Sequence, residues 1–177
     1  MTFTDLGLNP PREIIADDLL AVSLLDITWR PEVVRILLIS HKRELSDLLA
    51  GIPHDVDLWE ASADAMANCD LMWKALTMIE GIGTASASKL LARKRPRLCP
   101  ISDSVVRDAV DVPGRTWDVL RCLMEDPVAR AYVEALRPPE AAAASLLRIL
   151  DVALWVLYSK GAAAQQVREE ARLPAAG

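Results

Sequence analysis

Two glycines separated by one apolar residue, Gly81-Ile82-Gly83, lie between two stretches in which apolar residues recur at helical spacing. Glycine accepts backbone angles that other residues avoid, so this pattern favours a tight turn over a continuous helix. Thr84 has the side chain of an N-cap for the second helix. We therefore expect a hairpin of two helices over about residues 70–94, with a turn whose amides face outward.

The rest of the chain has the composition of a single all-α domain. Apolar residues form 52% of the 177 residues and aromatic residues only 5%, with Ala and Leu dominant. We expect one helical domain over residues 1–161 and a tail over 162–177. Prolines, glycines and apolar periodicity predict further helices, placed at about 12–28, 31–50, 57–67, 103–110, 115–125, 127–136 and 138–160.

The turn of the hairpin has the features of an anion site. The free amides of Gly83, Thr84 and Ala85 and the positive end of the second helix favour a phosphate. Five basic residues and no acidic residue then follow within 81–102, namely Lys89, Arg93, Lys94, Arg95 and Arg97. A basic patch on a chain of net charge −5 indicates a local polyanion site. The alternatives are a solvated helix end and a turn without a ligand.

The hairpin resembles the helix-hairpin-helix motif of DNA glycosylases. The residues that match the motif are Ile79, Gly81, Ile82, Gly83, Ala87 and Leu90. In those enzymes an extended link and a catalytic aspartate follow the hairpin, and Asp103 occupies that position after Pro100. The resemblance covers about residues 70–110 and implies an all-α glycosylase-like fold, in two lobes. The N-terminal and C-terminal helices would then pack together in the lobe that does not hold the hairpin. The whole chain also resembles an uncharacterised actinobacterial family, in segments 16–22 and 150–155.

Two residues of the hairpin depart from the glycosylase pattern. Ala85 occupies the position of the lysine nucleophile of bifunctional enzymes, and Lys89 lies one helical turn later, which argues against lyase chemistry. Glu80 replaces a common proline and places a carboxylate beside the anion site. A monofunctional enzyme needs only the aspartate, which stabilises positive charge on the sugar. Asp103 can serve that role, or it can simply cap the following helix.

Other polar residues have both structural and functional interpretations. Asp17 and Asp18 are either exposed acids of the first helix or pocket residues. Asp151 lies in an apolar helix, so it should pair with an arginine or face a cleft. The cysteines and histidines have neither metal-ligand nor disulfide spacing. The five tryptophans lie at apolar helical positions and are expected in the core, with base stacking as the alternative.

These features lead to three hypotheses of function. The first is a DNA-binding protein that contacts the phosphate backbone through Gly81, Ile82, Gly83, Thr84, Ala85, Lys89, Arg93, Lys94 and Arg95. The second is a monofunctional DNA glycosylase that uses Asp103, and the third is a glycosylase-like scaffold with a small-molecule or protein partner. We expect no cofactor or metal. With no secretion signal or membrane span in the sequence, we expect a cytoplasmic protein.

Overall fold

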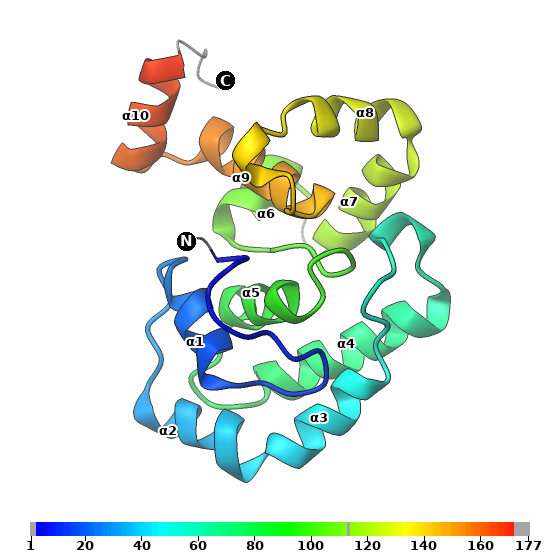
Figure 1. Ribbon diagram of the computed structural model, residues 1–177, viewed down its shortest axis with the longest axis vertical. Helices are drawn as coiled ribbons and strands as arrows, with labels where there is room; N and C mark the ends of the chain where they lie inside the picture. Colours follow the sequence, from blue (N-terminus) through cyan, green and yellow to red (C-terminus); the bar gives the residue numbers. More distant parts are fainter. Residues whose placement is uncertain (1–2, 113, 172–177) are drawn as a thin grey trace.

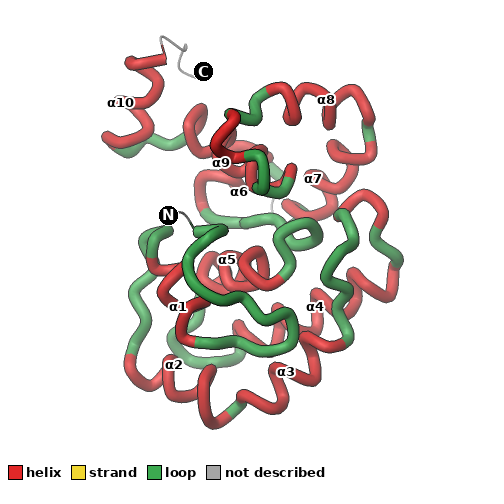
Figure 2. Tube along the Cα trace, viewed as in Figure 1, coloured by secondary structure: helices red, strands yellow, loops and turns green. Residues whose placement is uncertain are grey.

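The computed structural model describes residues 3–112 and 114–171. These residues form helices joined by loops, with no strand among them (Figures 1 and 2). The predicted all-α class is therefore confirmed for this part of the chain.

The first half of the chain surrounds one central helix, α5 (Thr84–Lys94). Both α1 (Ala16–Ser23) and α4 (Ala63–Thr77) pack directly on it. The elements between them are α2 (Pro31–Arg35), a π-helical turn (Ile36–Ser40), α3 (Lys42–Ala50) and a 3-10 turn (Leu58–Glu60). Figure 1 shows α5 in the middle of the molecule, with α1 to α4 along one side.

The second half of the chain lies on the other side of α5 (Figure 1). Its elements are α6 (Ser104–Val110), α7 (Thr116–Glu125), α8 (Pro127–Ala135), a 3-10 turn (Pro139–Ala141), α9 (Leu146–Tyr158) and α10 (Ala162–Ala171). Helix α9 packs against α6, α8 and α10. The predicted tail thus begins with a helix, and its residues 172–177 lie outside the described residues.

This arrangement corrects the expected division into lobes. We expected the N-terminal and C-terminal helices to pack together, away from the hairpin. Instead, α1 packs on the hairpin helix α5, and α9 packs with the helices that follow it. A single apolar core nevertheless runs through both halves, from Val22 through Leu90 and Val106 to Leu150.

Several helix boundaries also differ from those predicted. The first and last predicted helices shrink to α1 and α9, because the residues around them form loops and 3-10 turns. We expected a break at residues 68–69, yet α4 is continuous there. Cys69 and Met72 are fully buried on α4, so packing against the core keeps this segment helical.

Candidate nucleic-acid interface

The hairpin between α4 and α5 has the geometry that its glycine and apolar residues predict. Gly81 has a φ of +93°, in the left-handed region that favours glycine. Ile79 and Ile82 are buried on either side of it, and Ala87 is fully buried in α5. The turn is therefore held by the same core that holds the two helices.

The first turn of α5 leaves its backbone amides open. The N-cap is Gly83, not the predicted Thr84, and no side chain caps the helix. The Thr84 hydroxyl instead accepts a hydrogen bond from Arg107 Nη1, at 3.3 Å. A Cβ atom built on Gly83 would meet nothing within 4 Å, so the approach to these amides is unobstructed. An open helix N-terminus attracts negative charge.

The basic run at the other end of α5 is buried, which corrects the expectation that it forms a basic patch for a polyanion. Arg93 is 2% exposed. Its guanidinium donates to the backbone carbonyls of four residues of the N-terminal segment, at 2.6 to 3.2 Å: Phe3, Thr4, Leu6 and Leu8. Its Nε also contacts Asp18, at 3.3 Å. Arg93 thus fastens residues 3–8 to α5.

The next two residues, Lys94 and Arg95, are also buried and bind internal acceptors. Lys94 Nζ donates to Asp18 Oδ2 at 2.8 Å and to Asn9 Oδ1 at 2.7 Å. Burial lowers the pKa of Lys94, and the hydrogen bond from Lys94 to Asp18 opposes that shift. Arg95 donates to the carbonyls of Leu49 and Ile52, and so satisfies acceptors at the end of α3.

The expected basic surface of α5 is therefore wrong for Arg93, Lys94 and Arg95. Their charged groups are directed to internal acceptors and do not face solvent. Asp18, for which an exposed acid was one of two interpretations, is fully buried as the partner of Arg93 and Lys94. Asp18 is not exposed because two buried cations, Arg93 and Lys94, need a negative charge beside them.

Two arginines that we had not singled out lie beside the turn. The side chain of Arg30 is close to Gly81, since a Cβ there would be 3.6 Å from Arg30 Cδ. Arg107 projects from α6 and donates to Thr84 Oγ1 and to the Ser102 carbonyl. Both are exposed, and neither forms an ion pair within the described residues. They are far from the turn in sequence, so no local signal points to them.

Asp103 begins α6 in the N-cap role that was one of its two interpretations. Its Oδ1 accepts from the Val106 amide at 3.1 Å, and its Oδ2 lies 3.5 Å from Lys89 Nζ. Lys89 also donates to the Leu25 carbonyl at 2.9 Å and is 9% exposed. The Asp103 side chain is 18% exposed. Both residues are thus engaged inside the protein, and catalysis by Asp103 stays a prediction.

Asp151 lies near this pair, on α9. It forms an ion pair with Arg148, as the arginine interpretation requires. Burial raises the pKa of Asp151 to about 6, with Arg148 opposing the shift and the negative charge of Asp103 adding to it. The charges of Asp103 and Lys89 therefore both reach Asp151, the first raising its pKa and the second lowering it.

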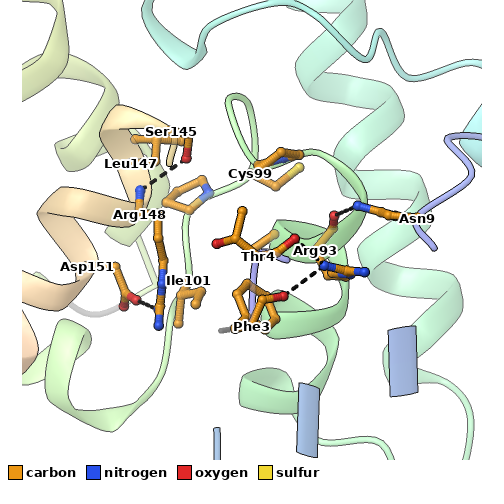
Figure 3. A pocket seen from close by; sticks show the side chains of 13 residues that line it. Phe3, Thr4, Asn9, Arg93, Cys99, Ile101, Ser145, Leu147, Arg148 and Asp151 are labelled. Carbon is orange, nitrogen blue, oxygen red and sulfur yellow. Dashed lines mark hydrogen bonds and ion pairs between the residues drawn. The ribbon is translucent and has the colours of Figure 1, made fainter. Parts of the chain in front are cut away.

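A small cavity lies between this region and the N-terminal segment. Figure 3 shows Arg148 and Asp151 on one side of it, with Thr4 and Arg93 on the other. Its volume is about 30 Å³, which is room for one or two water molecules. A nucleobase does not fit there.

A much larger groove adjoins the hairpin. It has a volume of about 540 Å³, and its lining includes Trp73 of α4, Thr84 of α5, Arg107 of α6 and Trp117 of α7. The groove brings the open end of α5 together with aromatic side chains. Within the described residues, no group of three or more acidic, histidine or cysteine side chains could hold a metal ion.

Comparison with known protein families matches residues 2–158 to a family described as a family of unknown function, DUF6308. The chain belongs to the DUF6308 family. The match agrees with the expected resemblance to an uncharacterised family, and it includes no glycosylase. Comparison of this DUF6308 chain with curated proteins and with solved structures gave no significant match. None of the helices in residues 3–112 and 114–171 has the length and apolar character needed to cross a bilayer.

Proposed function

We propose that this DUF6308 protein binds nucleic acid through its phosphate backbone, at the turn of the α4–α5 hairpin. The observation that carries the proposal is that two exposed arginines without an ion pair lie beside this turn. Arg107 is hydrogen-bonded to Thr84 at the open N-terminus of α5, and Arg30 lies next to Gly81. Backbone amides, a helix dipole and guanidinium groups are the donors that proteins direct at phosphates. Because Lys89, Arg93, Lys94 and Arg95 are buried, the proposed contact does not use them.

The charge of the protein sets the expected strength of this binding. Four side chains of the basic run, Lys89, Arg93, Lys94 and Arg95, are buried, whereas Asp18 is the one fully buried carboxylate among the described residues and Asp103, beside Lys89, is 18% exposed. The remaining surface is therefore more negative than the net charge of −5 implies. We expect weak, local contact with one or two phosphates. Two arginine contacts correspond to a slope of about −2 in log affinity against log salt.

Base excision has less support than binding. The side chain of Asp103 is hydrogen-bonded to the α6 backbone and faces Lys89, and it lines neither the small cavity nor the large groove. A glycosylase needs its carboxylate beside a pocket that accepts the target nucleotide.

The proposal is tested by duplex binding in 50 to 200 mM salt. We expect dissociation constants to rise about tenfold over that range. Arg30→Glu and Arg107→Glu should each weaken binding at least tenfold. Arg12→Glu is the matched control, because it makes the same change of charge at an exposed residue near the opposite end of α5. Arg12 follows Pro11, whose carbonyl accepts a hydrogen bond from Arg95, directly after α5.

A second variant tests the open amides. Gly83→Val fills the free space at the N-cap without a strained backbone angle, since Gly83 has a φ of −83°. We expect it to abolish duplex binding while unfolding stability changes by about 1 kcal/mol or less. Absence of wild-type binding at 50 mM salt, or equal binding by all four variants, would overturn the proposal.

A further inference from the structure

The groove beside the hairpin has the size of a nucleotide site. Its volume of about 540 Å³ lies within the range of small-molecule and cofactor pockets. It is lined by residues from α4, α5, α6 and α7, so residues far apart in the sequence build it together. A feature assembled from four helices is held in place by the core of the protein.

Two tryptophans give the groove its aromatic surface. Trp73 of α4 and Trp117 of α7 are half-buried, and each packs on the core while lining the groove. Core packing fixes the indole rings, so little side-chain freedom is lost when a planar ligand contacts them. Indole rings stack on nucleobases of any sequence.

The same groove contains the donors for a phosphate. Thr84 and Arg107 both line it, and Arg107 Nη1 is oriented by the Thr84 hydroxyl at 3.3 Å and the Ser102 carbonyl at 3.2 Å. No carboxylate of the described residues pairs with this guanidinium, and its remaining N–H groups are available for a ligand. The open amides of α5 begin at Thr84.

Two carboxylates also line the groove and restrict what can enter it. Asp70 is exposed on α4, and Asp118 on α7 pairs with Arg115 at 3.2 Å. Carboxylates accept hydrogen bonds from the amino groups of bases and repel phosphates. They therefore disfavour a run of consecutive phosphates along the groove, while a single base with one phosphate avoids that repulsion.

We propose that this groove binds one unpaired nucleotide, with its base on Trp73 and Trp117 and its phosphate at Thr84 and Arg107. The inference deepens the proposed backbone contact and rests on it for the phosphate end. The shared chemistry is a nucleobase joined to a 5′-phosphate. It can come from a free mononucleotide or from one residue of a single strand, and the experiment separates these two sources.

The test measures binding of the full chain to three probes at 50 mM salt: deoxyadenosine 5′-monophosphate, a ten-residue mixed-sequence single strand, and the duplex of that strand. We expect Trp73→Leu and Trp117→Leu to weaken binding of the single strand at least tenfold each, and to leave the duplex unaffected. Leucine preserves the apolar packing of each ring. Trp155→Leu, on α9, is the control for loss of a half-buried tryptophan.

The outcomes distinguish this inference from the proposed function. Tryptophan-dependent binding of the single strand or the mononucleotide supports the inference, and preference between these two probes identifies the source. If the single strand binds as the duplex does and neither variant matters, the groove is not a nucleotide site, while the backbone contact stands. If the duplex alone fails to bind, and binding of the other probes depends on both tryptophans, the groove inference holds and duplex contact is overturned. If no probe binds, both are overturned.

Discussion

Replacing Arg93 with methionine removes a buried guanidinium and keeps a flexible, unbranched side chain in place of its aliphatic part. Four backbone carbonyls, those of Phe3, Thr4, Leu6 and Leu8, then lose a charged donor, and Asp18 keeps Lys94 as its one cation together with the Ile15 amide. The first of these carbonyls is buried, and the others are partly buried and can regain water in part.

The expected loss of stability follows from these contacts. A hydrogen bond to a charged group contributes about 1.5 to 3 kcal/mol, and removal of one member of a buried charged network costs about 3 to 5 kcal/mol. Partial rehydration of the partly buried carbonyls places the loss at the lower end, about 3 kcal/mol. In a chain of this length that corresponds to a fall in Tm of about 6 to 12 °C.

Urea denaturation followed by circular dichroism measures this change, with Arg97→Met as the matched control. Arg97 belongs to the same basic run, but its side chain is 45% exposed and it pairs with Asp57 near the surface. We expect a loss of less than about 1 kcal/mol there. Equal losses for Arg93→Met and Arg97→Met, or a loss under about 1 kcal/mol for Arg93→Met, would refute the structural role assigned to Arg93.

Three further predictions test other parts of the structure. Gly81→Ala should destabilise the fold by about 1 to 2 kcal/mol, because it forces alanine to a φ of +93° with its Cβ 3.0 Å from Val33. Gly83→Ala is the control and should cost less than about 1 kcal/mol in the same urea titration. Asp103→Ala should cost about 1 kcal/mol of folding stability, because α6 loses its N-cap. Asp103→Asn keeps an acceptor and should retain most of that stability, so equal losses for the two variants in thermal melts would contradict the capping role. Since the pKa of Asp151 is raised to about 6 from 3.8, the folded state favours its protonated form, and its contribution to stability is lost as pH rises from about 4 to 6. Asp151→Asn should therefore flatten the dependence of unfolding free energy on pH across that window, and an unchanged profile would show that Asp151 does not titrate there.

The hairpin could be predicted from sequence because its signals are local. Gly81 sets the turn and Pro96 follows the end of α5. The helix predicted to follow a Thr84 cap and to end near Lys94 matches α5, which begins one residue earlier, at Thr84 itself. The buried end of α5 could not be predicted in the same way. Whether Arg93 faces water or the interior depends on carbonyls of residues 3–8, which lie 85 to 90 positions away. Four basic residues within seven positions, Lys89, Arg93, Lys94 and Arg95, would look the same in the sequence whether they bound a phosphate or formed internal hydrogen bonds.

In the candidate site, too, some features follow from neighbouring residues in the sequence and others from the packing of distant segments. The open amides of Gly83 and Thr84 follow from the turn itself. The cations that accompany them, Arg30 and Arg107, are brought there by the packing of α2 and α6, and nothing in their own segments indicates it. One sequence signal was available for the internal network. Asp18 stands among the apolar residues of α1, and a carboxylate in that setting needs a cation nearby.

The attachment of residues 3–9 to Arg93 and Lys94 has a consequence for the order in which the chain folds. Contacts separated by 85 to 90 positions cannot form until α5 has been synthesised, which at about 5 to 20 residues per second takes about 5 to 20 s after the N-terminus is made. Throughout that interval residues 3–9 lack their final partners on α5, and α1 lacks the helix on which it packs. Closing so long a loop is a slow step in an otherwise helical protein. An N-terminal fusion that holds residues 3–9 away from α5 should therefore delay folding more than the same fusion placed after α10.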